Sequence, residues 1–196
     1  MKRIMTMALL VMMLTTTAAF AAHGEWSGGG QGGMHIPSGD YADFAKSGYV
    51  LGVFLNYGVT PMFTLGVNLD LNSTKAKDEF INANAGVDEV KATLFNYGVN
   101  GALSFMPEAT VHPYVKVGGG MYNQKLETSA FGFTSDESTN DFGFCGGAGL
   151  MFQPAGNPVG FGVEALYHNV LTQDSSSQFI TVAGRISFSF SDASQK

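Results

Sequence analysis

The sequence predicts an all-β protein, an eight-stranded antiparallel up-and-down transmembrane β-barrel. The first observation is residues 63–73, where Phe63, Leu65, Val67 and Leu69 alternate with small or polar residues. A period of two indicates a β-strand with one apolar and one polar face. Second, the pattern recurs after almost every turn signal, at about the 9–11 residues of a tilted strand that crosses a bilayer. Third, the chain begins with an export signal.

That signal begins with the basic residues Lys2 and Arg3 and continues with an apolar run at residues 7–14. It ends with a small-x-small cleavage site at Ala19-Phe20-Ala21. The apolar run is too short to cross a membrane as a helix, so it predicts a secretory signal peptide at residues 1–21. Residues 22–196 are then expected to form one barrel domain. An exported chain with membrane-spanning strands indicates the outer membrane of a Gram-negative cell.

Composition agrees with this prediction. Charged residues are 13% of the chain, against about 25% in an ordinary soluble domain. Glycine occurs 26 times, where average usage predicts roughly 14, and strand bends with close packing in a narrow barrel account for the excess. Loss of Lys2 and Arg3 with the signal takes the net charge from −6 to −8, which argues against a nucleic-acid partner. The single cysteine, Cys145, allows no intrachain disulfide and is expected to face the barrel interior.

The strands follow from the turn signals between them. Strand 25–36 is rich in glycine and shows little alternation, but it makes the count even, which returns both termini to the periplasmic side. The remaining strands are expected at 48–59, 63–73, 90–105, 111–126, 141–152, 159–171 and 179–190. Short turns that carry proline, at 60–62, 106–110 and 153–158, alternate with longer polar stretches at 37–47, 74–89, 127–140 and 172–178. In barrels of this kind, the short turns face the periplasm and the long loops face the outside.

Aromatic residues collect at the ends of the apolar faces. Rings at both membrane interfaces are typical of membrane barrels. Those at the periplasmic ends are Trp26, Tyr57, Phe63, Phe105, Phe152, Phe161, Phe188 and Phe190, and those nearer the other end are Tyr49, Phe142, Phe144 and Tyr167. A soluble β-sandwich or lipocalin-like barrel is the alternative. Its polar faces would be rich in charged residues, whereas these are mainly Gly, Asn, Thr, Ser and Ala.

Two segments carry a family resemblance. One is residues 37–48 (PSGDYADFAKSG) with Leu51-Gly52-Val53 and 57–61, and the other is residues 112–122 (HPYVKVGGGMY). On these the chain resembles the outer membrane protein β-barrel domain family, which is similar to the small OmpA- and OmpX-type barrels. The resemblance covers nearly all of the chain after the signal, and it implies insertion by the barrel assembly machinery. Residues 191–196 follow Phe190, whereas members of the family often end on an aromatic residue.

No motif predicts an enzyme or a cofactor. Gly28, Gly30 and Gly33 have the spacing of a dinucleotide-binding motif but lack its sequence context, because no apolar strand is predicted before them and no helix after them. His168-Asn169 invites comparison with lipid A deacylases, but Val170 occupies the position of their serine. The four histidines lack metal-ligand spacing.

The polar faces predict an ionic network inside the barrel. Eight strands leave a lumen just wide enough for side chains to fill, and charges there must be paired. Lys116 and Arg185 are therefore expected to meet Glu164 and Asp70. The polar residues that alternation points inward and that are expected to form this network are Asp70, Lys116, Glu164, Arg185, Asn68, Asn96, Asn100 and His112.

The sequence thus predicts a non-enzymatic outer-membrane barrel, with a structural, envelope or surface-interaction role and a plugged polar interior. The alternative is a small porin-like channel for small or hydrophobic solutes, lined by the same groups. The expected partners are outer-membrane lipid and, during insertion, the assembly machinery. The barrel is expected to be monomeric and to need no cofactor.

Overall fold

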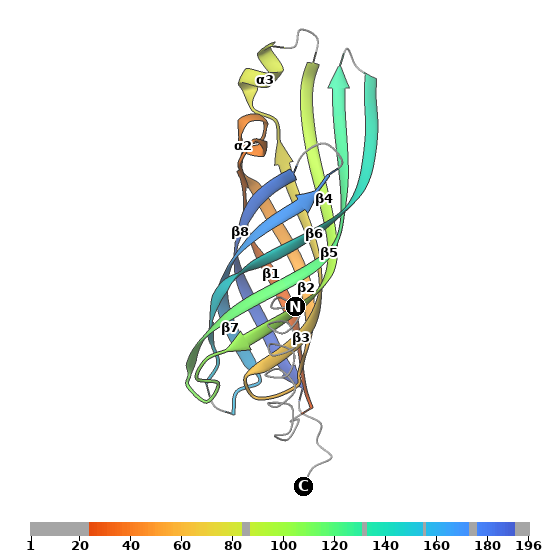
Figure 1. The fold of residues 1–196 in the computed structure, drawn as a ribbon. Helices are drawn as coiled ribbons and strands as arrows, with labels where there is room; N and C mark the ends of the chain where they lie inside the picture. Colours follow the sequence, from red (N-terminus) through yellow and green to blue (C-terminus); the bar gives the residue numbers. More distant parts are fainter. Residues whose placement is uncertain (1–23, 84–86, 131–132, 155, 173–175, 191–196) are drawn as a thin grey trace, which may run out of the picture.

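The computed structural model describes residues 24–83, 87–130, 133–154, 156–172 and 176–190. Eight strands make up most of this part of the chain (Figure 1). They are β1 (Glu25–Ser38), β2 (Gly48–Gly58), β3 (Phe63–Lys75), β4 (Val87–Ser104), β5 (Val111–Ala130), β6 (Phe133–Phe152), β7 (Val159–Leu171) and β8 (Ser176–Phe190). The predicted signal peptide lies outside the described residues and stays a prediction.

The eight strands form one closed barrel in chain order, and every neighbouring pair is antiparallel. Closure is made by β1 and β8, which pair from Trp26↔Phe190 to Ser38↔Gln178. The predicted fold class is therefore confirmed, including the glycine-rich first strand. A closed ladder satisfies the backbone hydrogen-bonding groups without leaving a sheet edge in the membrane.

The apolar faces point outward. In β3, Leu65, Val67 and Leu69 are each nearly half exposed, whereas the alternate residues Asp70 and Asn72 are buried. This is the reverse of a soluble barrel, which buries its apolar face, so the sandwich and lipocalin alternatives are wrong. The aromatic residues expected at the two interfaces all lie on the outer face, where they are exposed or half-buried.

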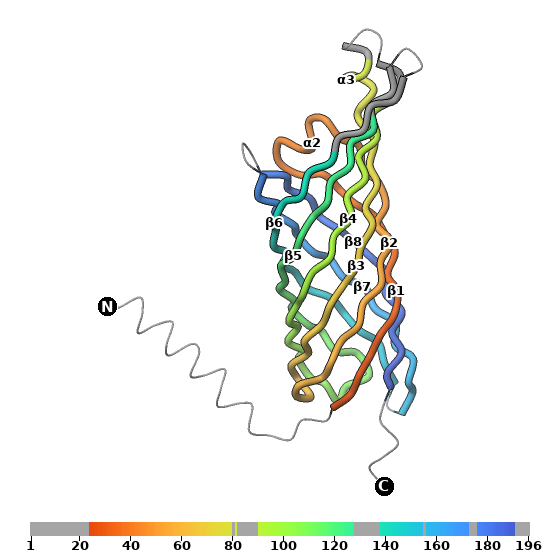
Figure 2. Tube along the Cα trace, turned by 90° about the vertical axis from the view of Figure 1, so that its right-hand side faces the viewer, coloured from red at the N-terminus to blue at the C-terminus, as the bar shows by residue number. Residues whose placement is uncertain are grey.

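The two ends of the barrel differ. Figure 2 shows short connections at one end, here called the turn end, where β1 begins and β8 finishes. At the opposite end, here called the loop end, β4, β5 and β6 rise beyond the other strands (Figure 1). β5 and β6 stay paired as far as Ala130↔Phe133. The expected loop at 127–140 is thus mostly a hairpin that continues both strands.

Two short helices lie at the loop end, α2 (Tyr41–Phe44) and α3 (Asp78–Ala83). The connection that carries α2 is held against the connection that carries α3 by an Ala45↔Ala76 bridge. Two backbone hydrogen bonds reinforce it, from Lys46 N to Lys75 O (2.7 Å) and from Lys77 N to Phe44 O (2.9 Å). We call residues 39–47 the strap. Within the described residues, no helix is both long enough and apolar enough to span a membrane.

Candidate functional site

The candidate site is the interior of the barrel. Of the eight inward-facing residues expected from sequence, six are buried, at 7% exposure or less. These six are Asp70, Asn96, Asn100, Lys116, Glu164 and Arg185. Asn68 and His112 are half-buried. The interior falls into two layers, one ionic and one aromatic, which the strap covers at the loop end.

The ionic layer is centred on the Glu164 carboxylate of β7. Lys116 Nζ, from β5, donates to both of its oxygens, at 3.0 and 3.1 Å. The Tyr114 hydroxyl donates to Oε2 at 2.8 Å. Arg185 Nη1, from β8, also contacts Oε2 and donates to the Tyr114 hydroxyl at 3.1 Å. The guanidinium lies 3.9 Å from the centre of the Phe54 ring, so an aromatic face covers the cation on another side.

A glycine on β6, Gly149, makes room for the contact between Tyr114 of β5 and Glu164 of β7. Tyr114 pairs with Gly149, and Gly149 pairs with Glu164, so the three residues form one inward-facing row across β5, β6 and β7. A Cβ placed on Gly149 would lie 2.4 Å from the Tyr114 ring. Because Gly149 has no side chain, the Tyr114 ring can occupy this space and its hydroxyl can reach Glu164.

Asp70 is held differently from the sequence prediction. Its carboxylate accepts hydrogen bonds from the side-chain amides of Gln31 and Asn68, the latter at 2.6 Å. Among the described residues, neither expected cation forms an ion pair with it. The register explains the difference: Arg185 pairs with Gln31, Gln31 with Gly52, and Gly52 with Asp70. The Gln31 amide therefore lies between the guanidinium and the carboxylate.

The remaining expected residues divide between this cluster and the turn end. Asn68 Nδ2 donates to Asn96 Oδ1 at 3.1 Å, and Asn100 Nδ2 donates to Asn68 Oδ1 at 3.2 Å. His112 does not join them: its Nδ1 lies 3.0 Å from the carbonyl oxygen of Ala109. The ring thus helps to close the turn that precedes β5.

The aromatic layer was not anticipated from sequence. The Phe179 ring is fully buried between two histidine rings, stacked on His35 at 4.2 Å and on His168 at 4.5 Å between ring centres. His168 Nδ1 is 2.9 Å from the Tyr122 hydroxyl, and its Nε2 is 3.1 Å from Thr181 Oγ1. Both ring nitrogens of His168 are therefore engaged within the layer.

The layer is tied to the wall and to the strap. His35 Nδ1 lies 3.1 Å from Asn72 Oδ1 on β3. Tyr41, from the strap, meets the His35 ring edge-on, with 6.1 Å between ring centres, and its hydroxyl lies 3.1 Å from Thr74 Oγ1. A Lys46–Asp78 ion pair at 2.7 Å, on the exposed surface, holds the end of the strap near α3. The strap thus sets a side chain over the mouth of the barrel.

These contacts do not assemble a reactive centre. His168 engages Tyr122 and Thr181, and Val170 stands where a deacylase would carry serine. The described residues contain no group of three or more His, Cys, Asp or Glu side chains that could hold a metal ion. Cys145 is half-buried and pairs with Gly118 and His168, which places it on the inward-facing register.

Comparison with known proteins agrees with this architecture. The sequence matches the family model described as "Outer membrane protein beta-barrel domain" over residues 7–190. No protein of curated function matches the chain in sequence.

Several solved structures share the fold. The attachment invasion locus protein Ail of Yersinia pestis, in complex with the heparin analogue sucrose octasulfate, has a TM-score of 0.55, 17% identity and coverage of 85% of this chain and 99% of that chain. Outer membrane protein OprG of Pseudomonas aeruginosa has a TM-score of 0.55, 11% identity and coverage of 87% and 98%. Neisserial surface protein A has a TM-score of 0.53, 13% identity and coverage of 88% and 99%. At these identities the likeness shows the fold alone.

Proposed function

Because the chain belongs to the outer membrane protein beta-barrel domain family, we propose that it is a closed, non-enzymatic barrel whose interior is a structural plug. Its place in the cell is the outer membrane. Its biological role then lies in the surface that it presents at the loop end, or in maintenance of the envelope.

The observation that carries this proposal is that the ionic and aromatic layers follow each other along the lumen. An eight-stranded barrel has an interior just wide enough for side chains to fill. Here Glu164 of β7 holds side chains from β5 and β8, and Phe179 of β8 is stacked between rings from β1 and β7. A solute would have to displace the strap and both layers in order to cross.

The loop end is proposed to face outside the cell, since long connections do so in barrels of this type. The sequence between the strands on that side carries Asp40, Asp43, Asp78, Glu79, Asp88, Glu89, Asp136, Glu137 and Asp174, against Lys46, Lys75 and Lys77. A surface of this charge favours a basic partner over a polyanion, although Ail is seen with a sulfated heparin analogue. The barrel is proposed to act as a monomer that the barrel assembly machinery inserts.

Conductance in planar bilayers tests the proposal. Purified folded protein should give no steady current, and its mobility on a denaturing gel should change on boiling because a closed barrel resists unfolding by detergent. Large, stable single-channel currents would overturn the plug and support the alternative, a small channel for small or hydrophobic solutes. Detection of hydrolase activity on membrane lipid would overturn the non-enzymatic part.

A further inference from the structure

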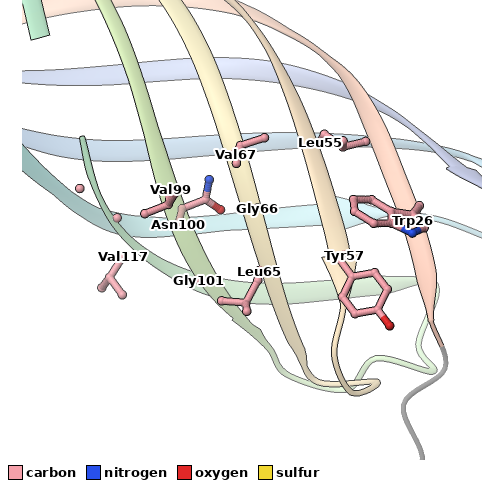
Figure 3. Close-up of a pocket in the computed structure, with 12 residues that line it drawn as sticks. Trp26, Leu55, Tyr57, Leu65, Gly66, Val67, Val99, Asn100, Gly101 and Val117 are labelled. Carbon is pink, nitrogen blue, oxygen red and sulfur yellow. The ribbon is translucent and has the colours of Figure 1, made fainter. Parts of the chain in front are cut away.

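The outer wall carries an apolar groove near the turn end. It has a volume of about 850 Å³ and crosses the outer faces of β1 to β5 (Figure 3). A second hollow of about 670 Å³ continues it across the wall and shares Leu55, Val67, Val99 and Gly119 with it. No residue that lines either hollow carries a charge.

The groove arises from two glycines on the outward-facing register. Gly101 lies between Leu65 and Val117 in one cross-strand row, and Gly119 follows Val99 in the next. The aliphatic side chains around them, Leu65, Val67, Val99 and Val117, are 49% to 67% exposed, so the missing side chains leave a depression between ridges. The rings of Phe63 and Phe142 also border the two glycines. A Cβ on either glycine would meet its nearest atoms at 3.4 Å, an ordinary contact distance. The depression could therefore hold side-chain atoms, and the sequence leaves it unfilled.

One end of the groove is amphipathic. Trp26 and Tyr57 pair across β1 and β2, with their ring centres 5.0 Å apart. Figure 3 shows the Tyr57 hydroxyl directed toward the turn end, away from Val67 and Val99. Tryptophan and tyrosine at the end of an apolar band mark the level of the lipid headgroups. The groove therefore runs from the headgroup level into the hydrocarbon region.

We propose that this groove is a binding site for one acyl chain of a phospholipid in the leaflet at the turn end. Its span from β1 to β5 covers four strand spacings, or roughly 19 Å. One leaflet contributes about half of a hydrocarbon core of about 30 Å, so an acyl chain has the length that the groove accepts. The uncharged lining excludes a headgroup from the groove, and the Trp26 indole and the Tyr57 hydroxyl supply donors where the glycerol esters begin.

The test uses the full-length folded protein in dioleoylphosphatidylcholine liposomes. After transfer to lipid-free detergent micelles, native mass measurement counts the phospholipid that each chain retains. Trp26 is the only tryptophan in the sequence, so a brominated form of the same phospholipid reports contact with the groove by quenching. In the micelles, the wild type should retain one phospholipid per chain. When the retained phospholipid is the brominated form, it should quench the fluorescence of Trp26.

Filling the groove provides the variant. Gly101→Leu with Gly119→Leu should lose both the retained phospholipid and the quenching. Gly30→Leu with Gly184→Leu is the matched control, because both positions face outward, line neither hollow and have no atom within 3.6 Å of an added Cβ. The control should behave as the wild type, and the shift in gel mobility on boiling shows that every variant is folded.

Three results would overturn the site. The first is that the filled variant and the wild type retain phospholipid equally, and the second is that the wild type retains none. The third is that the wild type has the mass of two chains and the filled variant has the mass of one. The last would assign the groove to a second copy of the chain. Because these readouts do not involve conductance, the acyl-chain site and the plugged interior fail or stand separately.

Discussion

At the residue scale, the Glu164 carboxylate is the group on which the ionic layer depends. Glu164→Gln leaves Lys116 and Arg185 in a buried site with a neutral partner. Removal of one member of a buried ion pair typically costs about 3–5 kcal/mol. We expect the free energy of unfolding, measured by urea titration in liposomes, to fall by that amount.

The matched control for Glu164→Gln is the same substitution in an exposed pair. Glu127 Oε1 lies 3.0 Å from Lys125 Nζ, and both side chains are more than a third exposed. Exposed ion pairs contribute about 0–1 kcal/mol, so Glu127→Gln should change the unfolding free energy little. Equal losses in the two variants would show that Glu164 does not anchor a buried network.

Gly149 provides a steric test of the same layer. In Gly149→Ala the new methyl group would lie 2.4 Å from the Tyr114 ring, so the ring must move and the Tyr114–Glu164 hydrogen bond must lengthen or break. A buried hydrogen bond to a charged group contributes about 1.5–3 kcal/mol, and we expect a loss of unfolding free energy in that range. Gly146→Ala is the control, because its Cβ would meet no atom closer than 3.8 Å, and it should be neutral. A neutral Gly149→Ala would contradict the close packing of the Tyr114 ring against Gly149.

Alternation predicted which residues face inward but not which of them meet. Lys116, Glu164 and Arg185 could be assigned to the interior because strand period alone sets the face. Gln31 could not be singled out, since the glycines around it show no alternation. Its contact with Asp70 depends on the register among three strands and on the gap at Gly52. The stack around Phe179 likewise depends on how far β1, β7 and β8 are staggered.

At the element scale, the contact between the strap and the barrel is expected to weaken at alkaline pH, because it includes the Tyr41 phenol. Burial raises the pKa of the Tyr41 phenol, and its hydrogen bond with Thr74 acts in the opposite direction. A phenol titrates near pH 10 in an unfolded chain. Because the unfolded chain loses this proton first, the stability that the neutral phenol supplies is complete below about pH 10 and is lost as the pH rises beyond it.

Tyr41→Phe should remove this part of the alkaline pH dependence. The difference in tyrosinate absorbance between the wild type and Tyr41→Phe should develop above about pH 10. The unfolding free energy of the wild type should also fall more steeply there than that of the variant. A difference spectrum that titrates at or below pH 10 would mean that the phenol is open to solvent and that the strap does not cover the mouth.

The elements at the loop end were the least predictable part of the fold. Strand 133–152 was expected to begin at residue 141, because residues 134–140 are polar on both faces and show no alternation. Beyond the membrane neither face needs to be apolar, so a strand there carries no period-two signal. The two short helices were missed for a related reason, since neither is long enough to show a helical period. Inside the apolar band, by contrast, the expected strand ends agree with the structure to within two residues at most positions.

At the scale of the whole molecule, the apolar outer face predicts a dependence on depth. Val163 lies between Phe161 and Tyr167 on the outer face of β7, whereas Val111 is the first residue of β5 at the turn end. An arginine on the lipid face costs about 2–4 kcal/mol at the bilayer midplane and about 0–1 kcal/mol near an interface. Val163→Arg should therefore destabilise the folded barrel in liposomes far more than Val111→Arg. Equal effects would mean that the band between the aromatic rings does not lie in hydrocarbon.

The two interior layers also make a prediction about the molecule as a whole. They lie one after the other along the lumen, so an ion meets both in turn, and opening one leaves the other closed. Glu164→Gln alone leaves Phe179 stacked between His35 and His168. Phe179→Ala alone leaves the Glu164 cluster intact, although it also removes one ring of the buried cluster against which Tyr41 packs.

Steady conductance should therefore be absent from each single variant and present when Glu164→Gln and Phe179→Ala are combined. Each change costs about 3–5 kcal/mol, so currents are compared only in protein that still shifts its gel mobility on boiling. A single variant that conducts as well as the double variant would show that one layer alone closes the lumen. A folded double variant without conductance would place the decisive closure at the strap, where Tyr41→Ala would then be the change that opens it.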